Sequence, residues 1–450
     1  MTPRLPLLLL VAACAAAPTV ESTTTAVTVP PTTTTTTLRA ADVYARVSPS
    51  LAFVETPVGS GSAVLVDART LVTNAHVVWP ADEVTVSFPN GPTGVVAVVG
   101  YDWMADLAVL DVSGLPALPA PAELESSPPE PGAAVYLVGY PADDPGTATP
   151  AITAGIVSRT RTWAEGGMTF IQSDTLISGG QSGGALVDEF GRVIGISGLS
   201  IGDGFALALT TGNLMSRLAS VRSDDDMDGL GARSVADLTG PTGNTGSVPY
   251  ELDETVFVFD GRAGDFVSIE VTGSAPLNVD LVGPDGFVEA SSDQPDVSAV
   301  LTAELILDGP YFIVIYPDVG PLDFVEVTGA ETRLWHDPDH GRILEIGTPL
   351  AANGDYPGDL DWFSLDLEAG QVVTITASSI NIDASLLVNH LVPAGESAFV
   401  SDSDSGGGVI GFDAVVEFTA PATGSYAVAV FDETGFGPGG YIVTVEAGRR

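Results

Sequence analysis

Short apolar runs separated by glycine, proline and aspartate dominate the first half of this chain. Four of them span residues 63–66, 84–88, 95–99 and 134–138, and each holds four or five residues rich in valine and alanine. Runs of that length and composition between turn-forming residues are typical of β-strands rather than helices. The pattern predicts an all-β fold here, and two packed antiparallel barrels fit it.

The second half of the chain contains an internal repeat. The segment from Phe257 to Val267 has a counterpart from Phe363 to Val373, and Gly-Pro-Tyr-Phe-Ile-Val at 309–314 has one in Gly-Ser-Tyr-Ala-Val-Ala at 424–429. Units of roughly a hundred residues with alternating strands and Gly or Asp turns predict β-sandwiches. We therefore expect two β-sandwich domains, at 247–330 and 331–450.

Length and charge limit the classes of partner. The 450 residues allow roughly three domains of about 150 residues each. The 58 acidic and 15 basic residues, all of the latter arginine, give a formal net charge of −43. Nucleic acids and anionic lipid surfaces should repel such a chain, so we expect no nucleic-acid partner. The charge favours solubility and is not evidence for a cationic substrate.

The N-terminus has the features of an export signal, which we assign to residues 1–17. Arg4 precedes an apolar run over 5–13 that is too short to span a membrane and ends in small residues. The sequence Val-Ala-Ala-Cys at 11–14 resembles the bacterial lipobox, which implies acylation of Cys14. A lipid anchor on the outer face of the bacterial membrane is therefore expected, with simple cleavage in the alanine run 15–17 as the alternative. Cys14 is the only cysteine, which excludes an intramolecular disulfide.

Two segments have the composition of linkers. Residues 18–38 are rich in threonine and proline, cannot bury apolar surface and should form an extended stalk. Residues 222–246 are rich in acidic residues and glycine, and Asp224, Asp226, Asp228 and Gly229 match positions one, three, five and six of a calcium loop. Position twelve is Val235 instead of glutamate. A solvated acidic linker is therefore the first interpretation and a Ca²⁺ site the second.

Three residues between the N-terminal stalk and the acidic linker have the types needed for nucleophilic catalysis. Ser182 lies in Gly-Gln-Ser-Gly-Gly, His76 in Thr-Asn-Ala-His, and Asp106 in Ala-Asp-Leu-Ala-Val-Leu. A serine needs an imidazole to accept its proton, and the imidazole needs a carboxylate to hold its tautomer. Glycines let backbone N–H groups approach an oxyanion closely, and we expect those of Gly180 and Ser182 to do so.

Chain order distinguishes two folds that carry such a serine. The same Gly-Gln-Ser-Gly-Gly segment fits the nucleophile elbow of α/β-hydrolases, in which the histidine follows the serine. The histidines after Ser182 are His336, His340 and His390, all within the β-rich repeats. The order His76, Asp106, Ser182 is that of chymotrypsin.

The segments around these residues resemble trypsin-like serine endopeptidases of the Deg/HtrA branch. The resemblance is carried by 59–63, 71–78, 183–187 and 191–196 and covers roughly residues 40 to 220. It implies a chymotrypsin-like double β-barrel at 39–221, with His76, Asp106 and Ser182 as the triad and Gly180 in the oxyanion loop. Gln181 differs from the Asn or Asp usual before the serine. Both C-terminal units resemble the bacterial pre-peptidase C-terminal domain, the second more clearly.

The same resemblance suggests a substrate pocket. The residue six positions before the nucleophile lies at the base of the S1 pocket in trypsin-like enzymes, and here it is Leu176. An apolar base favours small or apolar P1 side chains, whereas the carboxylate of Asp174 would reverse that preference if it reached the pocket. A structural role for Asp174 is the simpler interpretation. The predicted pocket residues are Leu176, Ile177, Ile196, Gly198, Leu199 and Phe205.

These observations predict an exported, lipid-anchored serine endopeptidase that cleaves protein or peptide substrates and requires no cofactor. The alternative is a catalytically inactive protease fold whose β-sandwich repeats bind a polymer or protein at the cell surface. An intact His76, Asp106 and Ser182 set argues against the alternative, and Gln181 is the one feature in its favour.

Overall fold

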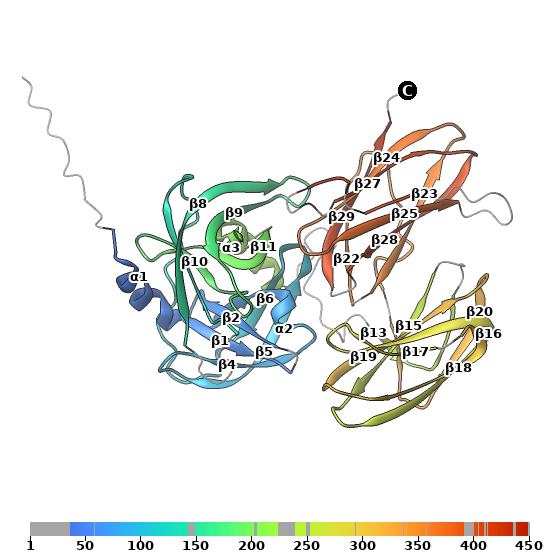
Figure 1. Cartoon of the computed structure of the whole chain (residues 1–450), viewed down its shortest axis with the longest axis horizontal. Helices are drawn as coiled ribbons and strands as arrows, with labels where there is room; N and C mark the ends of the chain where they lie inside the picture. The colour runs from blue at the N-terminus through green and yellow to red at the C-terminus, as the bar shows by residue number, and fades with distance from the viewer. Residues whose placement is uncertain are drawn as a thin grey trace, which may run out of the picture. The chain divides into compact units, whose positions relative to one another are not determined.

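Two closed antiparallel barrels of six strands each form the first part of the fold (Figure 1). The computed structural model describes residues 37–450 except 58, 143–148, 202–204, 224–238, 249–252, 293, 336, 357, 391–399, 404, 409–410, 412, 435–437 and 449–450. The predicted export signal with Cys14, the stalk up to residue 36 and the predicted calcium ligands Asp224, Asp226 and Asp228 lie outside the described residues.

The strands of the first barrel are β1 (Leu51–Glu55), β2 (Ser60–Leu65), β3 (Thr70–Thr73), β4 (Glu83–Ser87), β5 (Thr93–Asp102) and β6 (Leu107–Asp111). Those of the second are β7 (Ala134–Gly139), β8 (Ala151–Trp163), β9 (Met168–Leu176), β10 (Ala185–Asp188), β11 (Val193–Ile201) and β12 (Phe205–Thr210). They close in the orders β1-β2-β3-β6-β5-β4 and β10-β11-β12-β9-β8-β7. The predicted double β-barrel is confirmed.

Side-chain alternation explains why these short runs form barrel strands. In β4, Val84 and Val86 are buried, whereas Glu83 is exposed and Thr85 is partly exposed. Successive side chains of a strand point to opposite faces, so one face of β4 packs into the barrel and the other meets solvent. The apolar interior thereby fixes the register of the strands.

Three α-helices accompany the barrels in the described residues. They are α1 (Ala40–Val47), α2 (Ala75–Val78) and α3 (Thr211–Ser223), and the 3₁₀ turns Ser48–Ser50 (η1) and Trp103–Ala105 (η2) are shorter still. Helix α3 buries Leu214, Leu218 and Val221, a spacing that places them on one helical face. The strand pattern of the sequence did not predict these helices.

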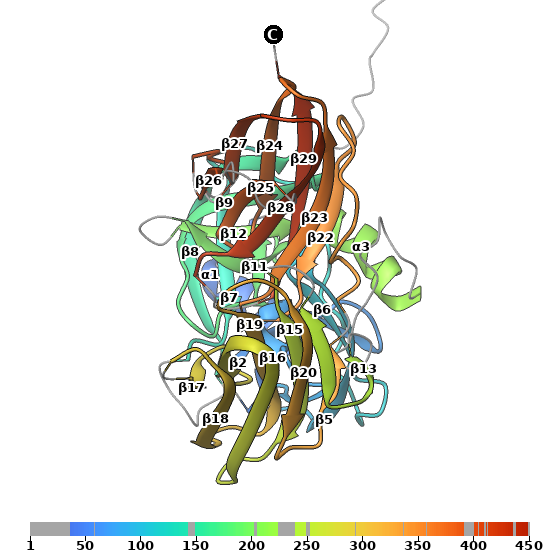
Figure 2. The same cartoon turned by 90° about the vertical axis from the view of Figure 1, so that its right-hand side faces the viewer.

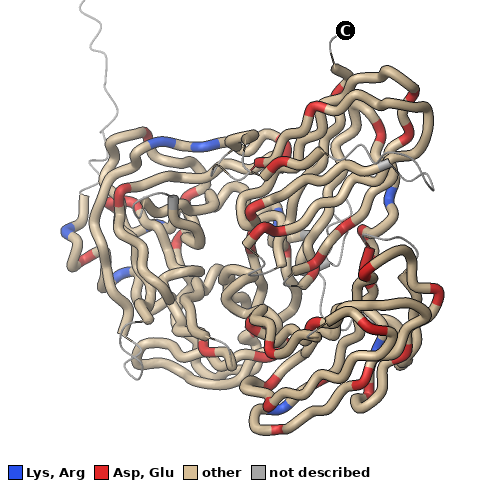
Figure 3. The backbone as a smooth tube through the Cα atoms, turned by 45° about the vertical axis from the view of Figure 1, so that its right-hand side comes forward, with Lys and Arg blue, Asp and Glu red and all other residues tan. Residues whose placement is uncertain are grey.

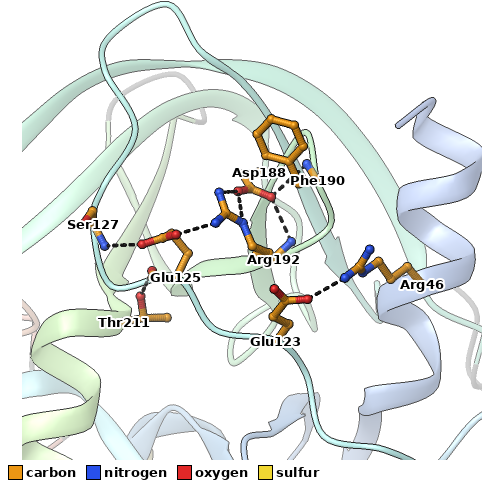
Figure 4. A network of polar contacts seen from close by, with 8 residues as sticks. All are labelled: Arg46, Glu123, Glu125, Ser127, Asp188, Phe190, Arg192 and Thr211. Carbon is orange, nitrogen blue, oxygen red and sulfur yellow. Dashed lines mark hydrogen bonds and ion pairs between the residues drawn. The ribbon is translucent and has the colours of Figure 1, made fainter. Parts of the chain in front are cut away.

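A polar network joins α1, the segment before β7, the β10–β11 turn and the start of α3 (Figure 4). Arg192 contacts Glu125 at 2.5 Å and Asp188 at 2.6 Å, and the Thr211 hydroxyl donates to the Glu125 carbonyl. Arg46 of α1 contacts Glu123 at 2.5 Å. The network holds the connection between the two barrels against the second barrel.

The first C-terminal unit is one nine-stranded sheet. Long strand β16 (Phe266–Val282) pairs with β18 (Asp296–Glu304) and β20 (Leu322–Thr328) near its start, and with β17 (Val288–Ser291) and β19 (Gly309–Pro317) near its end. Because β16 runs through both halves, the sheet folds over one apolar cluster that both halves share. The other strands are β13 (Thr239–Thr242), β14 (Thr245–Val248), β15 (Thr255–Gly261) and β21 (Arg333–Trp335).

Strands β13 and β21 lie outside the boundaries predicted for this unit. Strand β21 pairs with β13 and β15, so residues 333–335 belong to the first sheet although we assigned them to the second sandwich. Similarly, β13 and part of β14 fall in the segment predicted as a linker, and β14 pairs with β20. Hydrogen bonds to distant strands make these segments part of the sheet, and local composition did not reveal such pairings.

The second C-terminal unit consists of two four-stranded sheets (Figure 2). One has the order β22-β29-β24-β27 and the other β23-β28-β25-β26. Their bounds are β22 (Leu350–Gly354), β23 (Leu360–Leu367), β24 (Val372–Ser379), β25 (Ala384–His390), β26 (Val400–Asp402), β27 (Ala414–Thr419), β28 (Gly424–Asp432) and β29 (Gly439–Ala447). Both sheets contribute to a single apolar cluster, the arrangement of a β-sandwich.

Acidic residues are spread over the barrels and the C-terminal sheets, and basic residues are few (Figure 3). The strongly negative composition is therefore not concentrated in one described segment. None of the helices in the described residues has the length and apolar character needed to cross a membrane.

Candidate active site

His76, Asp106 and Ser182 come from three different connections between strands. His76 lies on the short helix α2 directly after β3, and Asp106 lies between η2 and β6. Ser182 lies in the turn between β9 and β10 of the second barrel. Asp106 has φ 49°, a left-handed conformation that aspartate tolerates better than most residues. The bend at Asp106 ends the η2 turn immediately before β6.

The structure brings the His76 imidazole and the Asp106 carboxylate into contact. His76 Nδ1 lies 2.7 Å from Asp106 Oδ2, and the backbone N–H of His76 donates to Asp106 Oδ1 at 3.1 Å. The Asp106 side chain is 3% exposed and that of His76 is 44% exposed. Asn74 supports this loop, because its Nδ2 donates to the Asp106 carbonyl at 2.8 Å. The buried carboxylate therefore fixes the orientation of a solvent-accessible imidazole.

Two opposing effects act on the His76 imidazole. Partial burial lowers the pKa of His76, whereas the charge of Asp106 and the hydrogen bond to it raise this pKa, and the net result lies above the ordinary value of 6.5. The raised pKa makes His76 a stronger proton acceptor than a free histidine. A base of this kind, oriented by a carboxylate, is suited to accept a proton from a serine hydroxyl.

Ser182 is less tightly coupled to the other two residues. Its Oγ lies 3.5 Å from the Gly198 carbonyl, and within the described residues no hydrogen bond joins it to His76. Catalytic hydrogen bonds are often long or poorly aligned before substrate binds. The strong contact in this site is thus the His76–Asp106 pair.

The loop around Ser182 depends on glycines at positions where a side chain would collide. Gly180 has φ 85°, and a Cβ there would lie 2.5 Å from the Tyr140 carbonyl oxygen. Gly183 has φ 79°, and a Cβ there would lie 1.9 Å from the Ser62 carbonyl oxygen. Among the described residues, no acceptor is found for the N–H groups of Gly180 and Ser182. Two unoccupied donors in a Gly-rich turn match what an oxyanion site requires.

Gln181 and Ser62 support the loop from both sides. Gln181 is 4% exposed, and its Oε1 accepts hydrogen bonds from the Ser178 backbone N–H at 2.9 Å and the Ser178 hydroxyl at 3.1 Å. Ser62 lies in β2. Its hydroxyl donates to the Gly180 carbonyl at 2.8 Å, and the backbone N–H of Ser62 donates to the Ser182 carbonyl at 2.8 Å. Glutamine therefore fills this position with satisfied hydrogen bonds within the loop.

A buried ion pair lies directly before Asp106. Arg217 Nη1 donates to both carboxylate oxygens of Asp102, at 2.7 and 2.6 Å, and the two side chains are 9% and 6% exposed. Asp102 Oδ1 also accepts from the Ala105 N–H at 3.1 Å and so caps the η2 turn. Sequence analysis missed this pair, because nothing local connects residues 115 positions apart.

The predicted pocket residues differ in how exposed they are. Leu176 is 66% exposed and Phe205 38% exposed, and the two are partners in the β9–β12 register. Ile177 and Leu199 are partly buried, and the Gly198 carbonyl faces Ser182 Oγ. The prediction for Ile196 is wrong, because its side chain is 1% exposed and packs in an apolar cluster that includes residues of both barrels. The strand register turns this residue inward.

Asp174 has a structural contact, as the simpler interpretation expected. Its Oδ1 accepts from the backbone N–H of Ile156 on the neighbouring strand at 2.6 Å. This contact ties the Asp174 carboxylate to β8.

Comparison with known proteins identifies two regions of the chain. Residues 61–196 match the family model of the trypsin-like peptidase domain, and residues 359–432 match that of the bacterial pre-peptidase C-terminal domain. The second match falls on the second of the two predicted repeats. The likeness of the first repeat to that family stays a prediction.

Curated relatives of the chain are serine endoproteases of the Deg/HtrA kind. DegS of Salmonella typhimurium (strain 14028s) is 29% identical over 284 residues, which cover 59% of this chain and 75% of that protein. PepD of Mycobacterium tuberculosis H37Rv is 30% identical over 251 residues, or 46% of this chain and 54% of that protein. DegS of Escherichia coli K12 is 34% identical over 197 residues, or 40% and 54%.

The chain thus spans about half of two of these relatives and three quarters of the third. Among solved structures, the inactive form of the Rv3671c protease is 26% identical, with a TM-score of 0.34 over 39% of this chain and 91% of that one. The sequence matches support a serine-type endopeptidase, a hydrolase of peptide bonds, in the first part of the chain.

Proposed function

We propose that the chain is an exported serine endopeptidase whose catalytic residues are Ser182, His76 and Asp106. The observation that carries the proposal is the 2.7 Å contact between His76 Nδ1 and the buried Asp106 carboxylate, beside a Gly-rich loop that presents Ser182. The relatedness of residues 61–196 to serine endoproteases supports it.

In the proposed mechanism, Ser182 Oγ attacks the scissile carbonyl while His76 Nε2 accepts the hydroxyl proton. Asp106 holds the proton of His76 on Nδ1, so that Nε2 is free to act as the base. The N–H groups of Gly180 and Ser182 stabilise the oxyanion of the tetrahedral intermediate. His76 then donates the proton to the leaving amine, and the acyl group on Ser182 is hydrolysed by water.

We further propose that substrates with small or apolar P1 side chains are preferred. Leu176 and Phe205 are exposed and adjacent in the β9–β12 register, and Asp174 is engaged by the backbone of Ile156. An apolar surface gains free energy from burying apolar side chains and offers no partner to a basic one.

Export and membrane attachment are part of the proposal and rest on the sequence of the N-terminus alone. The lipobox-like segment at 11–14 supports a lipid anchor on Cys14 at the outer face of a bacterial membrane. Mass spectrometry of the N-terminal peptide from a bacterial membrane fraction tests it. A diacylated Cys14 supports the anchor, whereas a free N-terminus within 15–17 shows simple cleavage.

The catalytic proposal is tested by labelling the purified chain with a fluorophosphonate and locating the adduct by peptide mass. An adduct confined to Ser182, and lost in Ser182→Ala, supports an activated nucleophile. Ser158→Ala is the control, because it removes an exposed hydroxyl of β8 outside the proposed site. A folded chain that forms no adduct would favour the alternative, an inactive protease fold whose C-terminal repeats bind a surface polymer or protein.

A peptide library with varied P1 residues tests the pocket. We expect cleavage after small or apolar residues, and Leu176→Asp should move the preference toward arginine. Leu176→Asn changes polarity without charge and should not create that preference. Cleavage by the unchanged chain mainly after arginine or lysine would refute the proposed apolar pocket.

A further inference from the structure

Five aspartates gather at the start of the second C-terminal unit. Asp337 and Asp339 precede β22, Asp355 and Asp359 lie between β22 and β23, and Asp361 lies in β23. Asp339, Asp355, Asp359 and Asp361 are each at most 6% exposed, and the Asp337 side chain is 12% exposed. Carboxylates are almost never buried without a compensating partner, so this aspartate cluster requires an explanation.

Oxygen atoms of the cluster lie at distances suited to a metal ion. Ligand atoms of Asp337, Asp359 and Asp361 all lie within 4.8 Å of one another, and so do those of Asp337, Asp339 and Asp355. Calcium binds oxygen at about 2.3–2.6 Å, so two ligands on opposite sides of the ion are about 5 Å apart. Both sets therefore fit around a cation of that size, and Asp337 is common to them.

Among the residues that the structure describes, the positive charges beside the cluster are too few to balance it. His340 Nδ1 lies 3.8 Å from Asp337 Oδ2, and Arg342 Nη1 lies 2.6 Å from Asp339 Oδ1. Burial, followed by repulsion from neighbouring carboxylates such as Asp337, raises the pKa of Asp359 and of Asp361 well above the ordinary range. Without a cation, the cluster must therefore hold protons or remain under electrostatic repulsion.

Two buried oxygen atoms at the cluster receive no hydrogen bond from any described residue, and this observation is independent of the number of carboxylates. Asp361 Oδ1 is one of them, although Oδ2 of the same side chain accepts from the Tyr441 hydroxyl. The other is the side-chain oxygen Oδ1 of Asn353. Asn353 is 2% exposed, and its backbone N–H donates to Asp339 Oδ2 at 3.0 Å. Buried acceptors without donors are rare in proteins and commonly mark a site for an ion or a water molecule.

An ion could reach the cluster from solvent. Asp337 and Asp359 line a pocket of about 220 Å³ together with Glu254, His340 and Tyr356. The pocket thus presents carboxylates of the aspartate cluster on its wall.

We propose that the aspartate cluster is a calcium site, with Asp337, Asp359 and Asp361 as its central ligands. The donors are carboxylate oxygens, which hard cations prefer, and no sulfur ligand is present among the residues of the cluster. Calcium accepts six to eight oxygens in irregular geometry, whereas magnesium requires a near-octahedral set. The site differs from the Asp224–Asp228 segment considered above.

Calcium bound here stabilises the C-terminal unit. The ion joins the segment before β22 to the start of β23, and it replaces repulsion among buried carboxylates with attraction. The proposal does not depend on the peptidase activity, so the two can fail separately.

The test uses the full chain with Ser182→Ala to prevent self-cleavage, treated with a chelator and titrated with Ca²⁺ by calorimetry. We expect saturable binding and a rise of roughly 5–10 °C in the midpoint of a thermal transition at a Ca²⁺ concentration of about 100 times Kd. An equal concentration of Mg²⁺ should give a much smaller rise. No saturable binding, or equal effects of the two ions, would overturn the proposal.

The variant Asp361→Asn distinguishes a calcium ligand from a residue with only a structural role, because its melting temperature relative to the parent should depend on Ca²⁺. In chelator the variant should melt at a higher temperature than the parent, because the neutral amide replaces a buried carboxyl that must otherwise be protonated or repelled, while Tyr441 retains an acceptor. In Ca²⁺ the order should reverse, with affinity at least 10-fold lower. The matched control is Asp366→Asn, an exposed residue of the same strand, which should respond to Ca²⁺ like the parent. If Asp361→Asn fails to fold, Asp359→Asn replaces it, and a variant that keeps full affinity refutes the assignment.

Discussion

Arg217→Met tests whether the buried ion pair holds the loop that carries Asp106. In the structure, Arg217 Nη1 binds both oxygens of Asp102, and less than a tenth of either side chain is exposed. The substitution leaves the Asp102 charge buried, with the Ala105 N–H as its remaining hydrogen-bond donor described above. Removing one partner of a buried pair costs about 3–5 kcal/mol, and we expect a loss of that size in the free energy of unfolding.

The assay is the urea midpoint of the peptidase region, measured by pulse proteolysis on the full chain with Ser182→Ala. Asp102→Asn combined with Arg217→Met removes the charge but keeps an acceptor for the η2 turn, so the double variant should recover about 2 kcal/mol of the loss. Arg46→Met is the control, since Arg46 and Glu123 are about half exposed and such pairs contribute at most about 1 kcal/mol. The reasoning would be refuted if the double variant were as unstable as Arg217→Met. It would also be refuted if Arg217→Met alone lowered the free energy of unfolding by less than about 1 kcal/mol.

Three other predictions concern the site. Asp106→Asn should lower kcat about 10⁴-fold with the fold retained, because the amide no longer holds the His76 tautomer; a loss under tenfold in peptide hydrolysis would contradict this. The neutral form of His76 is the base and the pKa of His76 is raised, so kcat/KM should increase with pH through a midpoint above 6.5. A midpoint below 6.5 would contradict the effect of Asp106 on this pKa. Gly183→Ala should destabilise the chain by at least about 2 kcal/mol in urea unfolding, because its Cβ would overlap the Ser62 carbonyl oxygen. Gly167→Ala, with φ 62° and open space around it, should cost only about 1 kcal/mol, and equal losses would show that backbone conformation alone decides.

Features that depend on local sequence patterns were predictable, whereas those that depend on strand pairing were not. The barrel strands were predictable because their runs are short, apolar and bounded by turn residues, and β4 shows the expected alternation. Ile196 was misplaced because a position in the chain does not reveal which face of a strand a side chain occupies. The boundary of the first C-terminal unit was misplaced because β21 pairs with β15, some seventy-five residues earlier in the chain.

The sequence by itself determined the chemical candidates, because serine, histidine and aspartate in that order, with glycines around the serine, restrict both the fold and the reaction. It also determined the net charge and the strand-rich repeats. Only the tertiary structure decided which groups meet: Asp102 with Arg217, Ser62 with the loop of Ser182, and Asp337 with Asp359 and Asp361. Such contacts depend on strand register and chain closure over long separations, and local patterns carry no information about either.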